Sequence, residues 1–427
     1  MSAIGSQTGF QGDEGTVNHK QEGRAKSPAK AGDVQSAQVR RYAMQRESQK
    51  VLTGHTYTRK RDGVDHNCTY RVTRCHRNPN ARAWNPGVDV VHYPDTGRYG
   101  YGNLVTCGST WHCPICSPKI TEYRRAELAA GAACVMGRGG EIAMVTLTYR
   151  HALDLPLAES LEAFYKARAK FFASRAFKEA MRDVLVVGRV YSTEVTFGAN
   201  GWHPHIHVLV LCEKRTPGIV DRLERLRDHW AHAVAKSGLG QINEHGFDVR
   251  NGDYAAEYIA KYGHEPAVFT WSAAHELTKS HVKQGRGGNL TPFDLLGILA
   301  SREGVPVGDR IIGPAEAENL FREYAIRFQG RQQLVWSKGL REELGLEADR
   351  SDEEIADGKG DNDIIGTLTL DQWRDVLRFR NGRGRLLALI GERGPEALPA
   401  FLAMLPKLKP NHPDEPWFSE EKQFRGY

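Results

Sequence analysis

The sequence lacks the features of a membrane protein and of a secreted one. None of its 427 residues lies in an apolar run of eighteen, and its most apolar stretches have only the length of a strand. The first fifty residues are polar and charged, without the apolar segment that a signal peptide needs. We therefore expect a soluble cytoplasmic protein with no membrane partner.

Two further signatures are missing. There is no internal repeat and no P-loop pattern, so a built-in ATP-driven motor of that kind is not expected. The chain has little excess charge, because 58 Lys and Arg face 52 Asp and Glu, which leaves a formal net charge of +6. Such a balance permits nucleic-acid binding without demanding it.

Composition divides the chain into segments that we expect to fold differently. Residues 342–363 stand out because they hold ten acidic and two basic residues, which is typical of a solvated linker. Strand and helix patterns over 141–262 follow the order β-α-β-β-α-β-α, which predicts an α+β fold with a ferredoxin-like, mainly antiparallel sheet. The expected segments are a disordered tail (1–45), a cysteine-rich zinc-binding segment with a helix (60–136), an α+β core (137–270), a basic helical extension (271–341), the acidic linker (342–363) and a mostly helical C-terminal region (364–427).

A row of alternating histidines is the most specific feature of the chain. His205 and His207 fall on one face of a predicted strand, and His203, a further expected ligand, continues the row at the start of that strand. Two imidazoles one pleat apart can share a divalent ion. If the preceding hairpin turns near residues 200–201, Glu194 lies opposite His207 on that face, although a slip of two residues would change this register. The pattern predicts a Mg²⁺ or Mn²⁺ site; the alternative is a strand whose histidines bind nothing.

A row of tyrosines follows about fifty residues later. Tyr258 and Tyr262 are neighbours on one face of a predicted helix, and Tyr254 lies one turn earlier. A tyrosine can attack phosphorus when a cation stabilises its phenolate. Lys261 lies about 100° around the helix and is better placed for a phosphate than for the phenol. The alternative is an aromatic stripe that packs the helix on the sheet.

Cysteine spacing predicts a structural zinc site. Four thiolates on Zn²⁺ would order a loop-rich segment that has too few apolar residues to fold by packing. Cys75 is preferred to Cys68 as the fourth ligand because it follows a short alternating apolar stretch, and His76 and His112 are possible substitutes. Cys113 and Cys116 have the CxxC spacing, for which a redox-active pair is the competing interpretation. No thioredoxin-like βαβ pattern surrounds these two residues. The expected ligands are Cys75, Cys107, Cys113 and Cys116.

Basic residues interleaved with aromatic ones are typical of surfaces that bind single-stranded DNA. Each such cluster by itself is more often a solvated face, so this pattern only supports the others. The expected DNA-binding residues are Arg124, Arg125, Lys279, Lys283 and Arg286.

Taken together, these motifs resemble a known family. The likeness covers about residues 70–340 and is specific because the histidine and tyrosine motifs occur in this order. The chain resembles the rolling-circle replication initiator (Rep) proteins of small bacterial plasmids, within the HUH endonuclease superfamily. The matching stretches are Cys107–Cys116, Val145–Tyr149, His203–His207, Tyr258–Tyr262 and Gly330–Leu340.

The resemblance implies a plasmid-encoded nickase and strand transferase of the bacterial cytoplasm. Such a protein acts on single-stranded or hairpin origin DNA, relies on host helicase and polymerase, and needs no ATP. Carried over by position, Tyr262 is the nucleophile that keeps the 5′-phosphate, and His205, His207 and Glu194 hold the metal. Tyr258 stands where some relatives have a glutamate for termination, and we expect it to act as a second nucleophile.

Two alternatives remain open at this point. Another HUH enzyme, a relaxase or a single-strand transposase, would use the same motifs. A zinc-containing DNA-binding regulator without catalysis would keep the histidine row and the tyrosine stripe only as structural features.

Overall fold

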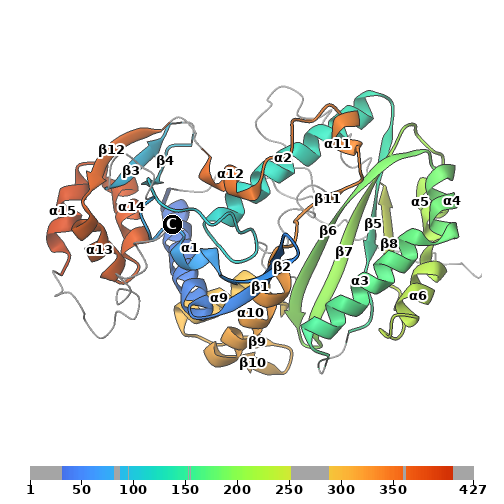
Figure 1. Cartoon of the computed structure of the whole chain (residues 1–427), viewed down its shortest axis with the longest axis horizontal. Coiled ribbons are helices and arrows are strands. Elements are labelled where there is room, and N and C mark those ends of the chain that lie inside the picture. Colours follow the sequence, from blue (N-terminus) through green and yellow to red (C-terminus); the bar gives the residue numbers. More distant parts are fainter. Residues whose placement is uncertain are drawn as a thin grey trace, which may run out of the picture.

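The computed structural model describes residues 31–80, 87–94, 96–151, 153, 155–251, 288–358 and 362–406 (Figure 1). Within these ranges the chain is α+β with antiparallel sheets, as the sequence predicted. None of the helices described there is both long enough and apolar enough to cross a membrane.

A five-stranded antiparallel sheet forms the right half of the molecule in Figure 1. Its spatial order is β11-β6-β7-β5-β8, so the first strand in the chain lies between the third and the fourth. The predicted order β-α-β-β-α-β is observed as far as residue 251, and the helix expected next lies outside the described residues. The strands are β5 (Glu141–Leu147), β6 (Val186–Gly198), β7 (Gly201–Cys212), β8 (Phe247–Asn251) and β11 (Val335–Trp336).

Helices cover most of one face of this sheet. Phe164, Phe171 and Trp230 are fully buried there against alternate residues of β5 and β7. Burying each such side chain contributes about 1.5–3 kcal/mol, so this face is the main core of the right half. The single helix expected over 158–182 is broken at Ser174, whose hydroxyl caps the second piece. The covering helices are α3 (Leu157–Ala173), α4 (Arg175–Asp183), α5 (Ile219–Glu224) and α6 (Arg227–Ala235).

The opposite face is covered at only one end by the elements that the structure describes. There Leu209 and Leu211 of β7 pack against α2 (Cys116–Gly137) and α11 (Leu340–Glu343). Side chains alternate along a strand, so the histidines at 203, 205 and 207 share this face with the two leucines. The histidine half of the strand extends beyond the apolar contact with α2.

The N-terminal segment differs from expectation, because residues 31–45 are helical rather than a disordered tail. They belong to α1 (Ala31–Leu52), which packs on α14 (Gly382–Arg393) and α9 (Pro292–Ser301). Its inner face is half polar: Gln45, Ser48 and Gln49 are buried and hydrogen-bonded to the cysteine-rich segment. Such a helix has no apolar stripe, which is why the hydrophobic pattern did not reveal it.

A second sheet joins distant parts of the chain at the left of Figure 1. Its order is β12-β3-β4, so residues near 90 pair with residues near 365. Trp373, Leu386 and Phe401 are buried beneath it. The elements are β3 (Val88–Tyr93), β4 (Arg98–Gly102), β12 (Asp363–Leu368), α13 (Leu370–Arg378), α14 and α15 (Ala397–Met404).

The acidic segment is not a free linker. It contains α12 (Asp352–Asp357), which packs on α2, and its last residue begins β12. Between α9 and this segment, Phe321, Tyr324 and Phe328 of α10 are buried in a core shared with the cysteine-rich segment. The remaining elements are β1 (Thr56–Arg61), β2 (Val64–Thr69), the 3₁₀ turn η1 (Arg71–Arg74), β9 (Val305–Val307), β10 (Arg310–Ile312) and α10 (Pro314–Phe328).

Candidate metal centres

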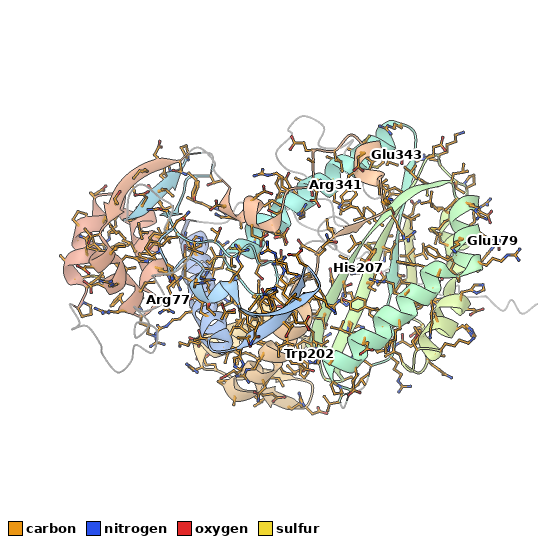
Figure 2. The ribbon with its side chains drawn as sticks, viewed as in Figure 1. Arg77, Glu179, Trp202, His207, Arg341 and Glu343 are labelled. Carbon is orange, nitrogen blue, oxygen red and sulfur yellow. The ribbon has the colours of Figure 1, made fainter. Side chains whose placement is uncertain are left out.

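The histidine strand and its partner place one carboxylate among the imidazoles. The hairpin closes with Gly198 opposite Gly201, so Glu194 pairs with His205 rather than with His207. The predicted register is therefore wrong by two residues, because the turn lies one residue earlier than expected. Since a shift of two preserves the face, Glu194 still points to the histidine side. Figure 2 shows His207 on this sheet, with Trp202 near the lower end of the strands.

Three side chains converge there into a compact donor set. The Oε2 atom of Glu194 lies 2.9 Å from Nε2 of His205 and 3.7 Å from Nε2 of His207. Glu194 is only 6% exposed, and its Oε1 atom is buried with no hydrogen-bond partner in the part of the chain that the structure describes. A buried carboxylate oxygen without a donor is costly. Two imidazoles and this carboxylate fit a divalent cation and leave other coordination positions open.

The charge state of the carboxylate suits a ligand. Burial raises the pKa of Glu194, but the adjacent imidazoles of His207 and His205 outweigh burial and lower this pKa to about 2. Glu194 is therefore ionised at neutral pH, as a metal ligand must be.

Two hydroxyl groups of β5 and its continuation orient the histidines. The Oγ1 atom of Thr146 lies 3.1 Å from Nδ1 of His207, so that Nε2 of this ring turns to Glu194. The Oγ1 atom of Thr148 lies 2.8 Å from Nε2 of His203. Both threonines belong to the Val145–Tyr149 stretch, to which the sequence alone assigned no role.

His203 lies outside the three-residue donor set, contrary to the expectation that it is a ligand. Its Nε2 atom faces Thr148, and its ring stacks on His151 with centroids 4.3 Å apart. Burial, together with His205 and His151, lowers the pKa of His203 to about 3, so this ring is neutral. His151 was missed by sequence reasoning, because nothing in its spacing links it to the histidine row.

The four cysteines selected from the sequence come together in a buried cluster. Their sulfur atoms lie 3.5 Å apart for Cys75 and Cys116, 3.6 Å for Cys75 and Cys113, and 3.7 Å for Cys107 and Cys116. A tetrahedral Zn²⁺ with Zn–S bonds of about 2.3 Å requires about 3.8 Å between sulfurs, so the cluster is close to that geometry. Cys68 lies on β2, outside the cluster.

The proposed substitute ligands have other partners. His76 Nδ1 lies 3.4 Å from the Tyr42 hydroxyl, and His112 Nε2 lies 3.0 Å from the carbonyl oxygen of Ala325. The choice of cysteine over histidine therefore agrees with the packing.

A buried arginine lies beside the cysteine cluster. Arg383 of α14 donates to Oε1 of Gln45 at 2.7 Å and to the carbonyl oxygen of His76 at 2.8 Å. Gln45 in turn donates to Sγ of Cys113 at 3.3 Å. A Zn²⁺ ion with four thiolates carries two net negative charges, which a nearby guanidinium offsets. Nothing in the sequence pattern indicated this residue.

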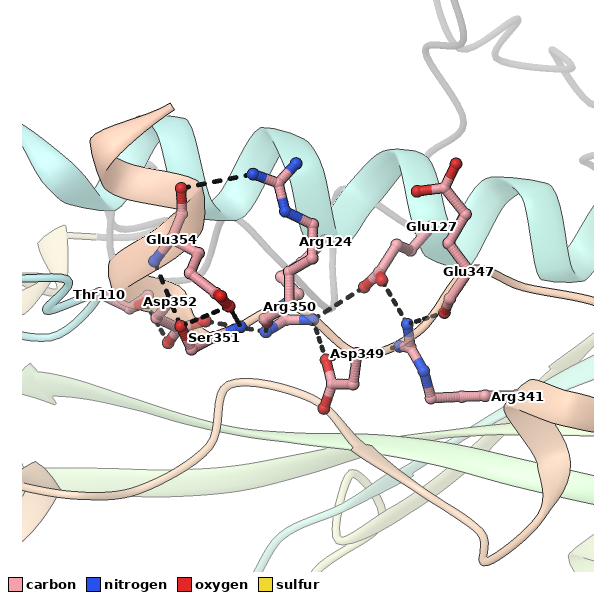
Figure 3. A network of polar contacts seen from close by, with 10 residues as sticks. All are labelled: Thr110, Arg124, Glu127, Arg341, Glu347, Asp349, Arg350, Ser351, Asp352 and Glu354. Atoms are coloured by element: carbon pink, nitrogen blue, oxygen red, sulfur yellow. Dashed lines mark hydrogen bonds and ion pairs between the residues drawn. The ribbon is translucent and has the colours of Figure 1, made fainter. Parts of the chain in front are cut away.

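The arginines expected to bind DNA on α2 face carboxylates of their own chain. Arg124 donates to Asp349 at 2.7 Å and to Asp352 at 3.0 Å, while Arg125 pairs with Glu122. Figure 3 shows the network, in which Arg341 bridges Glu127 and the backbone of residue 347. The contacts of Arg124 and Arg341 fasten the acidic segment to α2, whereas the pair of Arg125 and Glu122 lies within α2.

Several predicted site residues lie outside the described residues. Their roles stay predictions that rest on the sequence. They are Tyr258, Lys261, Tyr262, Lys279, Lys283 and Arg286.

Comparison with known proteins gives two relatives. The chain is 33% identical over 340 residues to "Protein rep" of Streptomyces lividans, which covers 64% of this chain and 73% of that protein. It is 29% identical over 140 residues to "Neomycin resistance protein" of Streptomyces cyanogenus, covering 27% of this chain and 32% of that protein. No protein-family model matches, and no solved structure matches significantly.

Proposed function

The chain belongs to the family of the Streptomyces lividans protein named Protein rep, and on this premise we propose that it initiates plasmid replication by nicking origin DNA. The observation that carries the proposal is the buried carboxylate of Glu194, which faces two imidazole Nε2 atoms and has one oxygen without a donor among the described residues. A cation there would be Mg²⁺ or Mn²⁺ and, when bound, would act as a Lewis acid on the scissile phosphate.

The sheet supports a ferredoxin-like HUH core. Counted along the chain, its first four long strands lie in the spatial order 2-3-1-4, and all pairs are antiparallel. Among the described elements, helices cover most of one face and only the leucine end of the other, which leaves the histidine end of that face for a DNA strand. In this proposal Glu194, His205 and His207 bind and orient the cation, and Thr146 fixes the ring of His207.

The proposed nucleophile is Tyr262. Its phenol oxygen forms a bond to phosphorus while the bond from phosphorus to the 3′ oxygen breaks. The departing oxygen takes up the proton that the phenol gives up, so one phosphodiester replaces another and no ATP is consumed. Lys261 would serve the phosphate, and Tyr258 would act as the second nucleophile that releases the circle.

The described residues that flank the tyrosine segment both lie on the large sheet, Asn251 at the end away from the histidines and Leu290 at the closed end of the histidine hairpin. Asn251 pairs with Ala143 at the end of β8, and Leu290 pairs with Phe197 at the closed end of the histidine hairpin. The segment between them thus starts and finishes at the large sheet.

The cysteine cluster is proposed as a structural Zn²⁺ site. It lies where α1, the segment before α2 and α14 meet, and a bound ion would tie Cys75 to Cys107, Cys113 and Cys116. Its sulfurs are buried, which suits a closed site without an open coordination position.

The direct test is a covalent adduct. The protein is incubated with Mn²⁺ and single-stranded DNA from its plasmid origin, and the adduct is mapped by mass spectrometry. We expect a phosphotyrosine on Tyr262, which Tyr262→Phe and Glu194→Gln abolish and the control Tyr254→Phe preserves. If no strand yields an adduct, the regulator without catalysis is the better interpretation. If strands from transposon ends or a transfer origin react instead, the protein is another HUH enzyme.

The second nucleophile has its own test. We expect Tyr258→Phe to retain the first nick but to lose release of the closed circle. Unchanged nicking and release in this variant would contradict the role given to Tyr258.

A further inference from the structure

The hairpin formed by β1 and β2 projects from the molecule with both of its faces in solvent. Every strand residue except Tyr57 and Cys68 is exposed. The strands are joined by Asp62 and Gly63, whose φ angles of 51° and 81° suit the tight turn typical of a regular hairpin. An isolated two-stranded hairpin contributes little stability by itself, so this element is not explained by packing.

The two faces of the hairpin carry different charge. The register places Arg59 opposite His66 and Lys60 opposite Asp65. Side chains alternate, so the arginine face holds no carboxylate, whereas Lys60 on the other face is balanced by Asp65. The arginine face consists of Tyr57, Arg59, Arg61, Val64, His66 and Cys68.

The base of this face is fixed and its outer part is not. The ring of Tyr57 lies 5.1 Å from that of the buried Tyr70, which anchors the hairpin to the cysteine-rich segment. Beyond Tyr57, the side chain of Arg59 makes no hydrogen bond or ion pair with the described residues. Arg61 is 3.7 Å from Asp62, and both side chains are at least 80% exposed, so this pair adds little.

We propose that the arginine face of the β1–β2 hairpin docks on duplex DNA, with Arg59 and Arg61 on backbone phosphates. The two arginines are two residues apart on one strand and therefore about 7 Å apart on the same face of the hairpin. A two-stranded ribbon, about 5 Å between strands plus side chains, fits the major groove, which is about 12 Å wide. The partner rests on the proposed function, which supplies DNA as the substrate.

The composition of the hairpin favours duplex over single-stranded DNA. Sites for single strands combine cations with exposed aromatic rings on which bases stack. The one Phe, Tyr or Trp side chain of these strands, Tyr57, is packed on Tyr70, so His66 is the only exposed ring there and cannot by itself stack successive bases. The hairpin therefore offers contacts to a phosphate backbone and no stacking platform.

The test measures binding of a fluorescent duplex of arbitrary sequence, about 30 base pairs or three helical turns long, as a function of salt. The Arg59→Ala/Arg61→Ala variant is compared with Lys166→Ala/Arg175→Ala, which removes two exposed cations from α3 and α4. Each lost phosphate contact lowers the slope of log K against log salt by about 0.9 and weakens binding about eightfold at 0.1 M salt. We expect the hairpin variant to lose about 1.8 in slope and the control to keep both slope and affinity.

The outcomes separate this inference from the proposed function. Nicking of a single-stranded origin oligonucleotide should be unchanged in the hairpin variant, and its thermal unfolding should match that of the wild type. Equal losses in both charge variants, or a loss for single strands only, would overturn the docking proposal. If the wild-type protein binds duplex DNA through the hairpin but never nicks DNA, the docking inference stands and the proposed nickase function is refuted.

Discussion

Replacing Thr146 by valine tests whether the threonine motif serves the metal site. Valine keeps the shape and the β-branch that suit a strand, and removes only the hydroxyl that lies 3.1 Å from Nδ1 of His207. One neutral hydrogen bond contributes about 0.5–1.5 kcal/mol, which is a factor of about 2 to 12 in binding. Loss of a hydrogen-bond partner of a metal-bound histidine typically weakens metal affinity about 10- to 100-fold. These two ranges of affinity loss overlap near tenfold. We therefore expect Thr146→Val to weaken Mn²⁺ binding about tenfold, as measured by calorimetry.

The neighbouring threonine supplies the matched control. Thr148 lies on the same face, but its hydroxyl bonds His203, which is not one of the three donors. Thr148→Val should therefore leave Mn²⁺ affinity within about twofold, and Thr146→Ser should restore it, because the hydroxyl is enough. Equal effects of the two valine variants, or no effect of Thr146→Val, would refute the positioning role.

Three further predictions concern stability and metal content. Arg383→Met should lower the free energy of unfolding by about 2–5 kcal/mol in urea, because it leaves Oε1 of Gln45 and a backbone carbonyl buried without a donor; a loss below 1 kcal/mol would contradict this. Gly140→Ala should lower the same quantity by about 1–3 kcal/mol, since a Cβ atom there meets the backbone of β7; unchanged thermal unfolding would show that the strand end yields. Purified protein should contain one Zn²⁺ per chain by elemental analysis, lost in Cys75→Ser and kept in Cys68→Ser; the reverse pattern would mean that the ligand set is wrong.

Local patterns were enough for the large sheet and for the cysteine cluster. The alternation around His205 fixed its strand and its face, because a period of two is unambiguous over ten residues. The predicted partner of Glu194 across the hairpin was wrong by two residues. The position of the turn determines the register, and the glycines around it allow the turn to form at more than one position. The sequence favours Cys75 over Cys68 because Cys75 follows the alternating stretch of residues 70–74; residues 71–74 form η1 rather than a strand, and Cys75 nevertheless lies in the cluster.

Features that depend on distant contacts escaped the sequence. The helix at Gln45 is stabilised by buried hydrogen bonds to another segment, and no hydrophobic period signals that. The acidic segment looked solvated because its partners, such as Arg124, lie more than two hundred residues earlier. Arg383 and His151 depend in the same way on neighbours that only the folded chain supplies.

The pairing of β12 with β3, and of α14 with α1, has a consequence for synthesis on the ribosome. The early strand cannot complete its sheet, nor the first helix its inner face, until about 390 residues have been translated. Domains whose contacts are local fold as they emerge, whereas closing a loop of this length must wait for its far end. The four clustered cysteines therefore leave the ribosome long before Arg383 is synthesised. Premature termination before β12 would leave one edge of β3 unpaired, and an unpaired edge favours aggregation.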